Sequence, residues 1–160
     1  MEAIGFERHN HHSCIVDGVS AARAHCEAAG LQLTPIRERV LEILLQEHRA
    51  LGAYDILDRL REEGQRSQPP VAYRALDFLV KHGFVHKIER LNSFVACVCP
   101  NKQHAPAFLI CTECGKVAEA ISGKLRNSLL DTSQSAGFAI ERTVVEAEGI
   151  CPNCQKESTG

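Results

Sequence analysis

The sequence predicts an α+β fold in two small domains. Apolar residues follow a helical period up to about residue 83, and short β-type runs take over after Gly83. The length agrees, because 160 residues fit one domain or two small ones. We expect a flexible tail over residues 1–18, a helical domain over 19–98, a hinge over 99–106 and a smaller α/β domain over 107–160.

Four helices are expected in the first domain. Residues 1–18 are polar and show no period, which is typical of a chain end. The first helix covers about 20–29 and stops at Gly30. The second follows Thr34 and Pro35, since threonine can cap a helix and proline fits its first turn. Its apolar residues share one face: Ile36, Val40, Ile43 and Leu44.

The third and fourth helices lead into a β-hairpin. The third covers about 53–63, with Ile56, Leu57 and Leu60 inward, and the fourth begins after Ser67 with two prolines. Beyond Gly83, the runs FVHKIER and SFVACV read as two strands joined at Leu91-Asn92. Helices followed directly by a hairpin predict a winged helix.

The second domain begins after the polar link PNKQHAP. Its expected elements are a strand at AFLIC, a turn at CTEC, a strand at KVAEA, a helix at about 121–135 and a long strand at FAIERTVVEAEGI. The chain then finishes with CPNC and a polar end.

Composition narrows the class of protein. No run approaches the ~20 apolar residues of a membrane span, and the N-terminus lacks a basic start followed by an apolar stretch. We therefore expect a cytoplasmic chain, in which eight cysteines indicate metal ligands or redox groups before disulfides. The net charge of −2 does not by itself indicate a nucleic-acid binder.

Two CxxC pairs predict a structural zinc site. Cys111 and Cys114 form the first pair, and Cys151 and Cys154 form the second. Each pair lets one tight turn aim two sulfurs at one ion, and two such turns complete a closed tetrahedral S₄ site. The pairs are separated by 36 residues, which leaves room for the expected helix and long strand.

Other interpretations of the two pairs were weighed. A redox CxxC normally opens a helix after a strand within a βαβ pattern, and neither pair is expected to do so. A zinc-ribbon interaction module would need only these four thiols. A metalloenzyme would need an open coordination position. A site with four protein ligands leaves no position clearly open, so we expect neither catalytic residues nor a small-molecule substrate.

Several potential ligands remain outside these pairs. His86 and Cys97 lie on the hairpin, His104 lies in the link, and Glu119 follows the first pair. Cys99 is two residues from Cys97, on the same side of a strand. The tail also carries potential ligands: His9, His11, His12 and Cys14.

Three features carry a family pattern: GFVHKIERLNSFVAC, then His104 seven residues before CTECG, then Glu119 after that CxxCG. They resemble the Fur family of metal-sensing repressors. LQLTPIRERVLEIL and PPVAYRALDFLVKHGFVHKI are similar to that family's second and fourth helices. The resemblance runs from about residue 20 to 154 and is greatest to the family's zinc-sensing branch.

The resemblance implies a homodimer with an N-terminal DNA-binding winged helix and a C-terminal dimerisation domain. It also implies two Zn²⁺ ions per subunit: one in the four-cysteine site and one regulatory ion at the hinge. The regulatory ligands would be His86, Cys97, His104 and Glu119, with Cys99 as a rival to Cys97. Here NKQHAPAF replaces the HHxH segment of iron and peroxide sensors. Two imidazoles, one thiolate and one carboxylate favour zinc over Mn²⁺, although a sensor of another metal or of peroxide stays an alternative.

The fourth helix is the expected reader of double-stranded DNA. At about 100° per residue, Tyr73, Arg74, Asp77 and Lys81 gather opposite the apolar side. Arg74 is the candidate for a base contact, since arginine pairs with guanine, and the family suggests Tyr54 as a second contact. The candidates for phosphates are Arg37, Arg39, Arg66 and Lys81. With zinc as corepressor, the dimer would bind a palindromic operator of zinc-uptake genes. The alternative is that the exposed side chains of the fourth helix form an ordinary solvated face.

Overall fold

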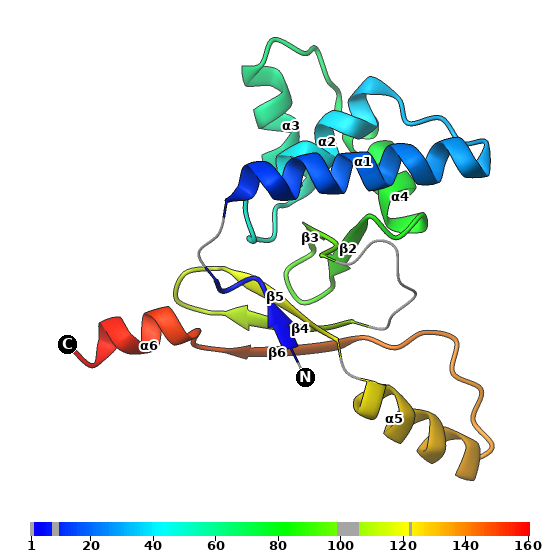
Figure 1. Cartoon of the computed structure of the whole chain (residues 1–160), viewed down its shortest axis with the longest axis vertical. Helices are drawn as coiled ribbons and strands as arrows, with labels where there is room; N and C mark the ends of the chain where they lie inside the picture. The colour runs from blue at the N-terminus through cyan, green and yellow to red at the C-terminus, as the bar shows by residue number, and fades with distance from the viewer. Residues whose placement is uncertain (1, 8–9, 99–105, 122) are drawn as a thin grey trace. The chain divides into compact units, whose positions relative to one another are not determined.

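A computed structural model describes residues 2–7, 10–98, 106–121 and 123–160. The chain divides into two compact units. The helical unit is Glu7–Lys102, and the sheet unit combines Met1–Phe6 with Gln103–Gly160. The α+β prediction is confirmed, with helices in both units and two small sheets (Figure 1). Within the described residues, no helix is both long enough and apolar enough to cross a bilayer.

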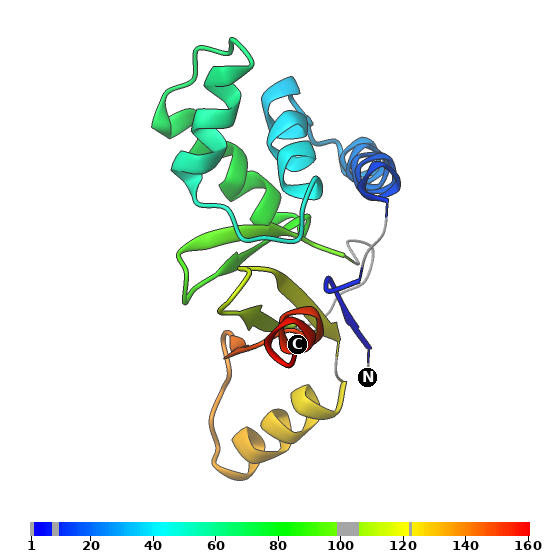
Figure 2. The ribbon, with the colours of Figure 1, turned by 90° about the vertical axis from the view of Figure 1, so that its left-hand side faces the viewer.

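Within its described residues, the helical unit contains four helices and a hairpin. The helices are α1 (His11–Ala29), α2 (Pro35–Leu45), α3 (Ala53–Glu62) and α4 (Pro69–Lys81). The hairpin pairs β2 (Val85–Ile88) with β3 (Ser93–Ala96), antiparallel, and follows α4 directly (Figure 2). Leu51 adds a short bridge to this hairpin, since Leu51 N donates to Phe94 O at 2.9 Å and Phe94 N donates back at 2.8 Å. This is the expected winged helix.

Local sequence explains these elements. Thr34 caps α2 by accepting a hydrogen bond from Arg37 N at 3.4 Å, and Pro35 occupies the first turn. Gly30, at a φ of 67°, ends α1 in the left-handed conformation that glycine adopts at low cost. The predicted inward residues form the core of the unit, which includes Val40, Ile43, Leu44, Ile56, Leu60, Leu76 and Leu79.

The sheet unit is built on four strands in the order β1-β5-β4-β6. They are β1 (Glu2–Ile4), β5 (Val117–Ile121), β4 (Pro106–Cys111) and β6 (Val145–Gly149). β4 pairs antiparallel with β5 and parallel with β6, which places Cys111 opposite Gly149. Two helices complete the unit: α5 (Gly123–Ser135) and α6 (Pro152–Ser158), which follows β6 (Figure 1).

The structure differs from the expectation of a flexible tail over residues 1–18. Residues 2–4 form β1 on the edge of β5, and α1 begins at His11, not near residue 20. Asn10 fixes this start, because its side-chain oxygen accepts a hydrogen bond from His12 N at 2.9 Å. Gly5 lets the chain pass close to β5, where a Cβ would lie 2.5 Å from Val117 O.

The last part of the chain also differs from expectation. The long strand over 138–150 is limited to Val145–Gly149. Val145 is the first residue of β6 in the ladder with β4, where it pairs with Ala107, one residue after β4 begins at Pro106. The polar end after Cys151, for which no helix was predicted, forms α6.

Candidate metal centres and nucleic-acid interface

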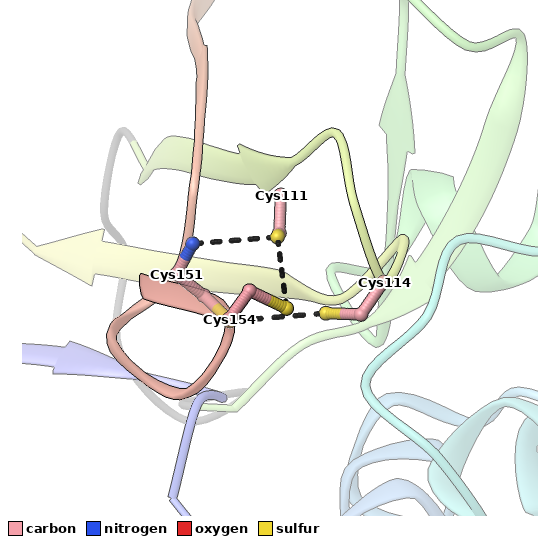
Figure 3. Close-up of side chains that lie close together, drawn as sticks. All are labelled: Cys111, Cys114, Cys151 and Cys154. Carbon is pink, nitrogen blue, oxygen red and sulfur yellow. Dashed lines mark hydrogen bonds between the residues drawn. The ribbon is translucent and has the colours of Figure 1, made fainter. Parts of the chain in front are cut away.

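The four cysteines of the two CxxC pairs converge in the sheet unit (Figure 3). Cys111 Sγ lies 3.9 Å from Cys154 Sγ, and Cys114 Sγ lies 3.8 Å from Cys151 Sγ. Zinc–sulfur bonds of about 2.3 Å in a tetrahedron separate two sulfurs by about 3.8 Å. The donor set and its spacing therefore fit one zinc ion.

Backbone structure positions these sulfurs. Cys111 is the last residue of β4, and the turn after it closes through Gly115, whose φ is 72°. Cys151 precedes α6 as its N-cap, and Cys154 lies in the first turn of that helix. The parallel pairing of β4 and β6 brings the two turns together. The site therefore joins the end of β4 to the segment that follows β6.

The sulfurs differ in their electrostatic surroundings. Cys151 N donates to Cys111 Sγ at 3.3 Å. Burial by itself raises the pKa of the Cys111 thiol, but N–H groups of Cys114, Cys151 and Glu113 outweigh burial and lower that pKa to about 6. A hydrogen bond with Cys151 and desolvation raise the pKa of the Cys154 thiol. Cys111 therefore already favours the thiolate that binds metal, and a cation would let the other sulfurs ionise.

One part of the argument against a redox role for CPNC is wrong. The second pair does open a helix after a strand, because α6 follows β6 and begins at Pro152. The helix that begins within CPNC was not visible in a segment with few apolar residues. The helix does not make the pair independent, since Cys111 Sγ and Cys114 Sγ lie against it.

The predicted regulatory ligands lie on both units. In the helical unit, His86 is on β2 and Cys97 follows β3, and their ligand atoms lie within 4.8 Å of each other. Cys97 is buried, and its N–H donates to Phe84 O at 2.9 Å. In the sheet unit, Glu119 is the central residue of β5 and is 3% exposed. His104 and Cys99 lie outside the described residues.

Of the potential ligands in the expected tail, two belong to a cluster that the sequence did not reveal. His11 and Cys14 lie in the first turn of α1. His48, from the segment after α2, completes the cluster. His12 is exposed, and His9 lies outside the described residues. His48 is isolated in the sequence, and no spacing rule connects it to residues 11–14.

The predicted DNA-reading face of α4 is exposed as expected. Tyr73, Arg74, Asp77 and Lys81 are exposed, whereas Ala72, Ala75, Leu76 and Leu79 are buried. Tyr54, in the first turn of α3, is 62% exposed although it is a large aromatic side chain. The helical unit therefore presents two tyrosines and an arginine to solvent from two of its helices.

The candidate phosphate contacts fall into two groups. Arg66 and Lys81 are exposed. Arg37, in contrast, donates to Gln32 O at 2.6 Å and stacks 3.8 Å over the ring of Phe78. Arg39 pairs with Glu42 and Glu63, whose side chains raise the pKa of its guanidinium. Arg37 and Arg39 thus have roles inside the fold that the sequence did not indicate.

Comparisons with known proteins agree on one family. The Ferric uptake regulator family matches residues 28–148. The Zinc uptake regulation protein of Escherichia coli (strain K12) is 39% identical over 137 residues, covering 85% of this chain and 80% of that protein. A solved structure of a zinc uptake regulator complexed with zinc and DNA superposes with a TM-score of 0.87 at 36% identity, covering 91% of this chain and 98% of that one. The structure of holo XcZur gives 0.79 at 40% identity, covering 86% and 96%. The family match spans most of the chain, and the chain therefore belongs to the ferric uptake regulator family.

Proposed function

We propose that this chain is a zinc-responsive transcriptional repressor of zinc-uptake genes, acting on chromosomal DNA in the cytoplasm. The observation that carries the proposal is the likeness, at 36% identity and a TM-score of 0.87, to a zinc uptake regulator complexed with zinc and DNA. The exposed Tyr54, Tyr73 and Arg74 supply side chains for such a contact. Members of this family regulate transcription, and no enzymatic activity is proposed.

Two zinc ions per subunit are part of the proposal. The four-cysteine site would hold the first. The second would be held by His86, Cys97, His104 and Glu119, with Cys99 as the alternative thiolate. The nearness of His86 to Cys97 supports this set, as does the burial of the Glu119 carboxylate, because buried charges are generally paired or coordinate metals. A bound ion would supply a crosslink between side chains of the two units, and it would restrict how the recognition helices of a dimer are spaced on a palindrome.

The DNA contacts follow from exposure and chemistry. Arg74 is proposed to read a base, because its guanidinium matches the two acceptors of guanine in the major groove. Tyr54 and Tyr73 would contact the same groove, and Lys81 and Arg66 would bind phosphates. Arg37 and Arg39 would stabilise the unit that carries these residues.

A homodimer is supported by apolar side chains that the single chain leaves exposed. Ser133 is the one buried residue among those described in α5, while Leu129 is 42% exposed and Phe138 is 66% exposed. A groove of about 300 Å³ runs beside α5 and is lined by Leu125, Leu129 and Val145. We propose that a second copy covers this surface, because monomers rarely leave a large apolar patch in water.

The function is tested by zinc-buffered binding to a palindromic operator, followed by fluorescence anisotropy. We expect affinity to rise with free zinc, to fall with a chelator and to return with zinc but not with Mn²⁺. Metal analysis should give at least two zinc ions per chain. Operator binding that ignores zinc, or a single zinc per chain, would contradict the proposal and favour a zinc-ribbon interaction module.

Replacing Arg74 by alanine should lower operator affinity by about 1–3 kcal/mol and relax specificity at one base pair. The reason is the loss of a bidentate base contact. Lys81→Ala should instead weaken binding to all sequences and reduce the salt dependence by about one phosphate contact. Equal loss on matched and scrambled operators for Arg74→Ala would show that Arg74 does not read a base.

Replacing Leu129 by glutamate should shift the dimer toward monomer, because it places a charge on the proposed interface. Sedimentation equilibrium measures this shift, and circular dichroism verifies that the helices persist. Asn127→Glu adds the same charge on the other side of α5 and should leave the dimer intact. If both variants remain dimeric, the interface lies elsewhere.

A further inference from the structure

The cluster of His11, Cys14 and His48 has the composition of a metal site. One ligand atom of each residue lies within 4.8 Å of the other two, and all three side chains are half-buried. The rings of His11 and His48 have centroids 5.1 Å apart. All three residues belong to the helical unit, so their arrangement is set within one compact body.

The fold explains why these residues meet. His11, Cys14 and Gly18 follow the i, i+3, i+7 spacing of one helix face. Gly18 allows α1 to approach the end of α2, since a Cβ there would lie 2.7 Å from Leu45 Cδ1. His48 follows Leu45 by three residues and so lies beside the first turn of α1. Asn10 caps that turn and keeps His11 within the helix.

The donor set selects a class of ion. Two imidazoles and one thiolate suit Zn²⁺ and its spectroscopic substitute Co²⁺, whereas Ca²⁺, Mg²⁺ and Mn²⁺ prefer oxygen. Small side-chain rotations would bring the three atoms to bonding distance of one ion. Three protein ligands leave a fourth tetrahedral position for water.

We propose that His11, Cys14 and His48 form a zinc-class metal site within the DNA-binding unit, separate from the four-cysteine site and from the predicted regulatory ligands. The site would tie the start of α1 to the segment that leads through Leu51 into α3. Leu51 is hydrogen-bonded to Phe94 of the wing, and Tyr54 follows on α3. Metal at this position would therefore brace the segment between the wing and a candidate DNA contact.

Cobalt titration of the full chain tests the proposal. The background carries Cys97→Ser and Cys99→Ser, which remove the thiols offered to the regulatory site, and retains zinc in the four-cysteine site. We expect one added Co²⁺ per chain, with a thiolate-to-cobalt charge-transfer band and a higher midpoint of thermal unfolding. In that background, Cys14→Ser should abolish the band, and His48→Gln should abolish or strongly weaken binding.

His12→Gln is the matched control, because His12 is exposed and adjacent to His11 but outside the cluster. It should leave the cobalt titration unchanged. A band that survives Cys14→Ser would overturn the proposal, as would equal losses for His12→Gln and His48→Gln, which would indicate loose chelation by a histidine-rich segment. Circular dichroism and zinc content verify that each variant is folded and keeps its four-cysteine zinc, and His48→Gln decides the matter if Cys14→Ser fails to fold.

Discussion

Replacing Cys111 by serine is expected to release the zinc of the four-cysteine site and to unfold the sheet unit. Structural zinc contributes about 10–16 kcal/mol in small zinc-dependent domains. Among its described residues, the sheet unit buries few apolar side chains besides its cysteines and so has few other sources of stability. They are Phe108, Ile110, Val117, Ala118 and Ala120. The helical unit has its own larger core and should stay folded.

Zinc analysis and thermal unfolding measure this effect. Cys111→Ser should lose one zinc per chain and unfold in two separate steps, the first at a much lower temperature than in the wild type. Cys97→Ser is the matched control, because it removes a buried thiol from the helical unit and should leave the four-cysteine zinc in place. An unchanged zinc content and unfolding midpoint in Cys111→Ser would refute a structural zinc at this site.

Replacing Cys97 by serine is expected to abolish most of the zinc-dependent gain in operator affinity. A zinc-dependent switch between two arrangements of a dimer needs a bias of several kcal/mol, which corresponds to about 100-fold to 10,000-fold in population. Serine is a far weaker zinc ligand than thiolate. The variant should therefore bind the operator in zinc as weakly as the wild type does in chelator.

The matched variant is Cys99→Ser, which removes the rival thiol two residues away. It should retain the zinc response if Cys97 is the ligand. The opposite result, a loss in Cys99→Ser and a normal response in Cys97→Ser, would transfer the ligand role to Cys99. A normal response in both variants would remove thiolate from the regulatory site altogether.

The predictable parts of the fold are those with a local signal. Thr34-Pro35 predicts the start of α2, and the change of hydrophobic period after Gly83 predicts the hairpin. The two CxxC pairs, with the space between them, indicate a common site, and the structure brings their four sulfurs together. In the first two cases residues close in sequence carry the information, and in the third the same CxxC spacing occurs twice.

The parts that were missed depend on distant partners. β1 has three residues and no amphipathic pattern, and it becomes a strand because the edge of β5 accepts it. β6 is shorter than its β-type sequence, and its ladder with β4 runs from Val145 to Gly149. His48 becomes a potential metal ligand only because α1 approaches the end of α2. No periodicity in the sequence predicts that approach.

The sheet unit combines a segment before the helical unit with a segment after it, and this affects the order of folding. Glu2 pairs with Ile121 and Ile4 pairs with Glu119, so β1 acquires its partner only after residues 119–121 have been synthesised. In the sequence, the helical unit stands between β1 and β5. It can therefore complete its core first, since domains generally fold as units from the N-terminus during synthesis. We expect a nascent chain whose residue 102 has just left the ribosomal exit tunnel to protect the amides of α2 and α4 from exchange while residues 2–4 still exchange freely. Residues 2–4 thus leave the ribosome before the helical unit but reach their native hydrogen bonds after it.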